Sequence, residues 1–144
     1  KDFKTSRLMK NILLLIVFIA LVACKNPQSE IKKTILYNDS IGYWDHEWPR
    51  DRAEFSGATL KFEKNGKISH YSFNKIKNNR TLFGGYEDLV VPNTWSISED
   101  SILTYLNKKK KIIKYNSDTV WLYDKEMKYN SMLIKVKGNL NIEN

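Results

Sequence analysis

Apolar and polar residues alternate with a period of two along most of the chain beyond residue 33. No stretch of about a dozen residues there keeps the apolar stripe that an amphipathic helix requires. Short alternating runs separated by Asn, Asp, Ser and Gly are typical of antiparallel strands joined by hairpins. The pattern predicts an all-β domain, which is a small antiparallel β-barrel of about eight strands or a closely related sandwich.

The clearest hairpin spans residues 58–73, where an Asn-Gly pair separates two alternating runs. An Asn-Gly pair favours a two-residue type I′ turn. With that turn, Leu60 pairs with Tyr71, and His70 lies on the solvent face. The residues expected on the inward face are Ala58, Leu60, Phe62, Tyr71 and Phe73.

A second hairpin is expected around a three-residue turn at residues 99–101. This turn places Ile97 opposite Leu103 and Trp95 opposite Tyr105, although Ser is less suited than Gly to the left-handed position of such a turn. The pairing would add four large apolar side chains to one face of the sheet.

A third hairpin is expected around residues 116–118, and residues 132–137 predict a closing strand. The first strand is expected at residues 41–48, and an irregular strand is expected near residues 81–86. The total is eight or nine strands, which is enough for a small barrel.

The chain has a different pattern near its start, where residues 12–23 are all apolar and follow Met9, Lys10 and Asn11. A basic start and an apolar stretch of this length match a secretory signal peptide, whereas a membrane-spanning helix needs about 20 apolar residues. Met9 is the expected start of translation, so residues 1–8 are not expected to belong to the folded domain.

The apolar run ends in Leu21, Val22, Ala23 and Cys24, which resembles the lipobox of bacterial lipoproteins. The resemblance implies that signal peptidase recognises the first three residues and cleaves before Cys24, whose thiol carries diacylglycerol. Two or three acyl chains, at about 0.8 kcal/mol per buried CH₂, would hold the protein at the membrane permanently. The alternative for Cys24 is an ordinary buried thiol. In proteobacterial lipoproteins, an Asp directly after the lipidated Cys is associated with retention in the inner membrane. Lys25 stands at that position here, so the resemblance favours the outer membrane, with the domain facing the periplasm or the cell exterior.

The chain is therefore expected to have three parts: residues 1–23, with the signal peptide; residues 24–33, with the lipidated cysteine and a polar tether; and residues 34–144, with one β domain. Cys24 is the only cysteine, so the domain has no internal disulfide. The net charge of +8 falls to +5 without residues 1–23. A moderately basic domain is attracted to anionic headgroups. Nucleic acid is not an expected partner, because the lipid anchor places the domain outside the cytoplasm.

Gly42, Tyr43 and Trp44 resemble the G-x-W motif of lipocalins, in which the Trp packs across the closed end of the barrel. The features that follow, LKFEKNGK, WSISEDSILTYL and a strand pair around NSD, are similar to those of compact lipocalin-like lipoproteins of Bacteroidetes. The resemblance covers residues 41–136. It implies a barrel whose mouth binds a small hydrophobic or amphiphilic ligand, without catalysis. The chain departs from the large lipocalins in having no room for their C-terminal helix after Gly138.

Asp45, His46 and Glu47 are the residues that suggest acid/base or metal chemistry. On a strand, neighbouring side chains point to opposite faces, so Asp45 and Glu47 can converge while His46 points away. His70 is the only other histidine, and phosphate-binding loops and paired cysteines are lacking. No catalytic residue, metal or other cofactor is therefore expected, and the chain is predicted not to be an enzyme. The four lysines at 108–111 are interpreted as a solvated strand edge, with a headgroup contact as the alternative.

Aromatic and aliphatic residues of the predicted strands are the remaining candidates for a site. They are Trp44, Leu60, Phe62, Tyr71, Phe73, Trp95, Ile97, Leu103 and Tyr105. If they line a cavity, the protein binds a small apolar ligand. If they fill the barrel, an alternative applies, in which an envelope interaction or inhibitor protein acts through its surface on a protein partner.

Overall fold

The computed structural model describes residues 27–37, 40–48, 56–83 and 93–143, and the all-β prediction is confirmed for them. They form one short helix and ten strands. The elements are α2 (Pro27–Ile35), β1 (Ile41–Glu47), β2 (Ser56–Glu63), β3 (Ile68–Asn74), β4 (Asn79–Leu82), β5 (Trp95–Ile97), β6 (Ile102–Tyr105), β7 (Lys108–Tyr115), β8 (Thr119–Asp124), β9 (Tyr129–Lys135) and β10 (Ile142–Glu143).

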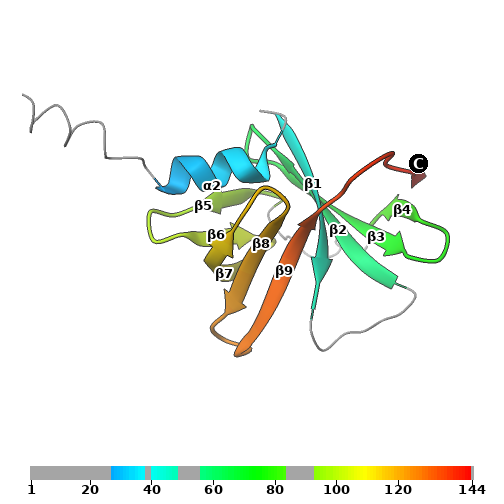
Figure 1. Ribbon diagram of the computed structural model, residues 1–144. Helices are drawn as coiled ribbons and strands as arrows, with labels where there is room; N and C mark the ends of the chain where they lie inside the picture. The colour runs from blue at the N-terminus through cyan, green and yellow to red at the C-terminus, as the bar shows by residue number, and fades with distance from the viewer. Residues whose placement is uncertain (1–26, 38–39, 49–55, 84–92, 144) are drawn as a thin grey trace, which may run out of the picture.

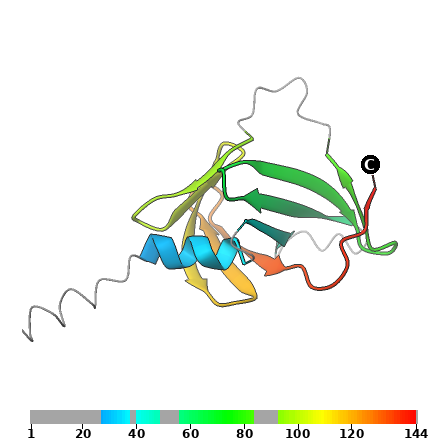
Figure 2. The same ribbon diagram turned by 90° about the horizontal axis from the view of Figure 1, so that it is seen from above.

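All ten strands belong to one curved sheet, in the order β10-β4-β3-β2-β1-β9-β8-β7-β6-β5 (Figure 1). Every pair is antiparallel except β10 and β4. The strand ladders of the described residues do not close this sheet into a barrel. A single bridge between Lys67 and Thr94 joins the β5 end to the turn between β2 and β3 (Figure 2). The Trp95 amide strengthens this contact by donating to the Gly66 carbonyl at 2.8 Å.

Residues 27–35 form helix α2, although residues up to 33 were expected to form a polar tether and residues from 34 onward to belong to the β domain. Ile31 and Ile35 lie one turn apart and are 2% and 0% exposed, because they pack onto the sheet. Pro27 suits the first helical position, where its missing N–H costs no hydrogen bond. Two buried residues in nine are too few to give a periodic signal, so only the sheet beneath the helix reveals its apolar face.

The G-x-W segment holds the end of α2 against β1. A side chain on Gly42 would place its Cβ 1.7 Å from the Ile35 carbonyl oxygen, so only glycine allows this approach. The Trp44 indole Nε1–H donates to the same carbonyl oxygen at 2.9 Å, and the Trp44 side chain is fully buried. A helix carbonyl that has no partner within the helix is thereby satisfied.

The β2–β3 hairpin differs from the predicted one in the length of its turn. Three residues, 64–66, form the turn, and the Glu63 amide donates to the Lys67 carbonyl at 2.9 Å. Gly66 has a φ of +84°, as expected for the left-handed third residue of such a turn. Phe62 therefore pairs with Ile68, where a two-residue turn would have paired it with Ser69.

This shift by one residue reverses the predicted faces of β3, because side chains alternate along a strand. Leu60 pairs with His70, so His70 shares the inner face with the core residues of β2. Tyr71 and Phe73 lie on the outer face, opposite Thr59 and Gly57. The prediction that Tyr71 and Phe73 point inward was wrong, as was the solvent position of His70.

The β5–β6 hairpin confirms its predicted register. Trp95 pairs with Tyr105, and Ile97 pairs with Leu103. Ser101 takes the left-handed position, with a φ of +58°. Packing of the four apolar side chains outweighs the modest preference for glycine in this turn.

Candidate functional site

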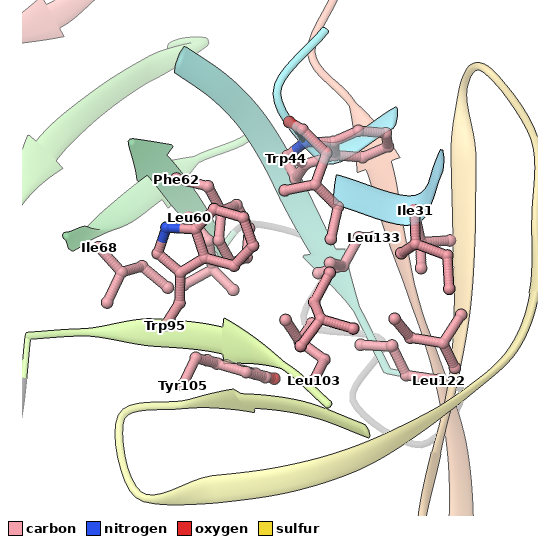
Figure 3. Close-up of a cluster of buried hydrophobic side chains, with 14 of the residues drawn as sticks. Ile31, Trp44, Leu60, Phe62, Ile68, Trp95, Leu103, Tyr105, Leu122 and Leu133 are labelled. Carbon is pink, nitrogen blue, oxygen red and sulfur yellow. Dashed lines mark hydrogen bonds between the residues drawn. The ribbon is translucent and has the colours of Figure 1, made fainter. Parts of the chain in front are cut away.

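The inner face of the sheet has an apolar end beneath α2, where the side chains form one hydrophobic core (Figure 3). Phe62 meets Trp95 edge-to-face, with ring centroids 5.2 Å apart. Seven of the nine predicted cavity or core residues lie in this cluster: Trp44, Leu60, Phe62, Trp95, Ile97, Leu103 and Tyr105. Each is at most 6% exposed, so these side chains pack against one another as in an ordinary protein core.

Tyr71 and Phe73, the other two predicted residues, lie on the outer face, where the Tyr71 ring is 6.5 Å from the Tyr43 ring and Phe73 belongs to a group around Arg80. The Phe73 ring lies 3.9 Å from the Arg80 guanidinium, which is almost fully buried. Arg80 also donates to Asp45, at 2.9 Å and 3.1 Å, and to the Thr59 hydroxyl at 2.8 Å. The group ties β4 to β1 and β2, and it occupies Asp45 with a structural ion pair.

His46 points away from Asp45 and Glu47, as alternation along the strand predicts, but the two acidic side chains that could have converged bind different cations. Asp45 binds Arg80, Glu47 binds Lys75 at 3.0 Å, and His46 is buried on the inner face. Among the described residues, no group of three or more His, Cys, Asp and Glu side chains could hold a metal ion.

The inner face becomes polar at its other end, farther from α2. Lys110 of β7 is only 1% exposed there. Its Nζ donates to the Tyr129 hydroxyl at 2.9 Å and to the Ser131 hydroxyl at 3.5 Å, and lies 3.7 Å from an oxygen of Asp124. A buried ammonium group is stable only when it is paired in this way.

His46 lies in the same polar end and is 4% exposed. Its Nε2 atom has no hydrogen-bond partner among the described residues. Burial lowers the pKa of His46 to about 3, and the positive charge of Lys110 adds to this shift. The imidazole is therefore neutral near pH 7, and an unpaired polar atom in such a place has a cost in free energy.

Trp48 packs beside His46, with ring centroids 4.1 Å apart. The Trp48 Nε1–H donates to the Tyr129 hydroxyl at 3.2 Å, the same hydroxyl that accepts from Lys110. His70, on the same inner face, forms a second ring pair with Phe83, and the two ring centroids are 5.0 Å apart. Burial lowers the pKa of His70.

The polar residues that meet at this end of the inner face are named together as the polar cluster: His46, Lys110, Asp124, Tyr129 and Ser131.

The polar cluster was not predicted, and the interpretation of residues 108–111 as one solvated edge was wrong. In the structure β7 pairs with β6 on one side and β8 on the other, so it is not an edge strand. Lys110 is buried while Lys109 and Lys111 are exposed. The usable signal was the alternation itself, since Lys110 is two residues from the buried Ile112 and therefore shares its face.

The open grooves on the surface of the described part of the chain include one beside β1 and one at the start of α2. One, of about 580 Å³, lies between β1 and the segment after β9; its lining residues include Tyr37, Tyr43, Lys135 and Leu140. The other, of about 380 Å³, lies at the start of α2 and is lined in part by Ile113 and Tyr115. Both grooves are surface features and neither contains a member of the polar cluster.

The predicted lipid attachment residue Cys24 and the recognition residues Leu21, Val22 and Ala23 lie outside the described residues. Within the described part of the chain, no helix has the length and apolar character needed to cross a membrane.

Comparisons with known proteins do not assign the chain to a family. No family model matches it, and neither curated proteins nor solved structures give a match.

Proposed function

We propose that the chain is a bacterial envelope lipoprotein, held at a membrane by lipid on Cys24, whose lipocalin-like β domain binds a small amphiphilic ligand without catalysis. The lipobox-like sequence supports the anchor. The observation that supports ligand binding is the buried Nε2 atom of His46, which lacks a partner among the described residues. Unpaired buried polar atoms are uncommon in native proteins, so this nitrogen is expected to have a partner that the described residues do not supply.

The chemistry of the polar cluster suggests which part of a ligand would bind there. Lys110 already has three partners, while the neutral imidazole of His46 has one nitrogen to offer. A ligand group that forms one hydrogen bond, such as a hydroxyl, carbonyl or carboxyl group, would satisfy it. The ligand's apolar part would contact the neighbouring aromatic side chain of Trp48.

Native mass spectrometry tests this proposal on the protein purified from its own host in a mild detergent. The wild-type chain is expected to retain a small molecule, and His46→Phe is expected to lose it because Phe cannot form the hydrogen bond. Lys109→Met is the control, since Lys109 is exposed on the same strand as Lys110. If the wild-type protein shows no bound small molecule in repeated preparations, ligand binding is contradicted.

The anchor has a separate test, in cells grown with a labelled fatty acid. The wild-type protein is expected to take up the label, and Cys24→Ser is expected to remain an unlabelled, uncleaved precursor. Persistent labelling of Cys24→Ser would show that the anchor assignment is wrong.

A second candidate function is binding of a protein partner through the outer surface, as an envelope interaction or inhibitor protein. The close packing of the apolar end of the inner face favours it, because seven candidate residues there are at most 6% exposed. Crosslinking on intact cells separates the two functions. A specific crosslinked protein, together with a native mass spectrum that shows no bound small molecule, would support this second candidate.

A further inference from the structure

The distance between Cys24 and the folded domain is short. Only residues 25 and 26 separate Cys24 from Pro27, where α2 begins. An extended chain spans at most about 3.6 Å per residue, so the Cα atoms of Cys24 and Pro27 lie within about 11 Å of each other. If the Cys24 lipid is in a bilayer, as the proposed function states, the first turn of α2 lies at the headgroup layer.

The surface at this end of α2 has exposed apolar side chains. A β-bulge in β7, between Ile112 and Lys114, interrupts the alternation of side chains. Beside this irregularity, Ile113 is 55% exposed and Tyr115 is 38% exposed. Both line the groove of about 380 Å³ at the start of α2, together with Pro27, Ile31, Ser101, Ile112 and Lys114.

Charges near this groove are mixed. Lys114 lies over the Trp121 ring at 5.0 Å, and the Lys111 ammonium donates to the Asp100 carbonyl. Glu99 and Asp100 are exposed in the turn that contributes Ser101 to the groove. Because lysines and carboxylates are both present, apolar contact and not net charge has to supply the attraction of this surface for a partner.

We propose that this surface docks onto the interfacial layer of the phospholipid bilayer that holds the Cys24 lipid. We call it the anchor-side face and define it by Pro27, Ser101, Ile113, Lys114 and Tyr115. The bilayer is the occupant that fits, because the chain leading to Pro27 is too short to keep this face away from it. Tyrosine and isoleucine suit this environment, since an aromatic ring with a polar tip and an aliphatic chain both partition into the boundary between headgroups and acyl chains. Docking holds the domain in one orientation at the membrane.

The test attaches one 14-carbon chain to the Cys24 thiol of the mature protein, which starts at Cys24, through a maleimide. A single chain of this length binds bilayers only reversibly, so additional protein contacts become measurable. Binding to vesicles of phosphatidylethanolamine and phosphatidylglycerol is measured by sedimentation. Ile113→Asp is expected to weaken binding at least about fivefold. Met127→Asp is the matched control, because Met127 is 67% exposed in the β8–β9 turn, and it is expected to change binding by less than about twofold.

Hydrogen exchange on the same vesicles gives a second measurement that does not depend on a variant. The amides of residues 112–115 are expected to exchange more slowly on vesicles than in solution, while those near Ile76, in the β3–β4 turn, are expected not to change. Equal weakening by the two Asp variants, or unchanged exchange at residues 112–115, would overturn docking.

Failure of docking is distinguishable from failure of the proposed anchor. The maleimide attachment bypasses lipidation in the cell, so the vesicle experiment tests the anchor-side face alone. Fatty-acid labelling of the wild-type protein in cells tests the anchor alone. Labelling without vesicle protection refutes docking only, whereas absence of labelling removes the anchor and, with it, the biological basis of docking.

Discussion

The two ends of the inner face are built by the same strands but stabilised differently. Each of four strands carries an apolar residue at the α2 end of the inner face and a polar residue at the other end. The two residues are two positions apart in the sequence, so they share one face. The pairs are Trp44 and His46 on β1, Ile112 and Lys110 on β7, Leu122 and Asp124 on β8, and Leu133 and Ser131 on β9. The apolar end gains stability from buried area, which tolerates small losses, whereas the polar end depends on each partner being present.

The largest expected effect concerns the apolar end, where α2 is held against β1. Gly42→Ala would place a methyl group against the Ile35 carbonyl oxygen, which forces the helix away from Trp44. We expect a loss of about 4 kcal/mol in the free energy of unfolding, measured with urea. Gly57→Ala is the control, because its nearest neighbour is the flexible end of Lys75 at 3.2 Å, and it is expected to cost less than about 1 kcal/mol. Equal losses would show that α2 is not held by this close approach.

The next effect concerns the buried ion pair of the polar end. Lys110→Ala leaves the Asp124 carboxylate without its cation, and we expect a loss of about 3 kcal/mol in urea unfolding. Lys109→Ala removes the same charge from the exposed neighbour and is expected to change stability by less than about 0.5 kcal/mol. A small effect of both substitutions would mean that the polar end needs no cation.

The stability of the polar end is expected to depend on pH through His46. Its folded pKa of about 3 is below the ordinary value of 6.5, so the unfolded chain binds more protons between these two values. Stability therefore decreases as the pH falls, by about 2 kcal/mol between pH 7 and pH 5. His46→Phe is expected to remove most of this dependence in urea unfolding at the two pH values. An unchanged pH dependence in the variant would assign the effect to other groups, among them His70, whose pKa is also lowered by burial.

The smallest effect separates the strong contacts of Lys110 from the weak one. The Ser131 hydroxyl accepts from Lys110 at 3.5 Å, compared with 2.9 Å for Tyr129. Ser131→Ala is expected to cost about 0.5–1 kcal/mol, and Tyr129→Phe is expected to cost more because it removes the shorter bond. The reverse order would indicate that Ser131 is the main partner of Lys110.

The amino-acid sequence predicted most of the strands. Period-two alternation is a local property, and it located β1, the β5–β6 pairing and the strands on both sides of residues 116–118. The opposite orientation of His46 and Asp45 also followed from alternation alone. The lipidation of Cys24 and the lipocalin-like ligand site remain predictions of the sequence.

The tertiary structure decided three features that local patterns leave open. An Asn-Gly pair is compatible with turns of two or three residues, and the choice of three moved Tyr71 and Phe73 to the outer face. Ile31 and Ile35 became helical core residues because a sheet lies beneath them. Lys110 became buried because Asp124, Tyr129 and Ser131, distant in sequence, supply its partners. Each outcome depends on the free energy of contacts between distant segments, which no local window of the sequence contains.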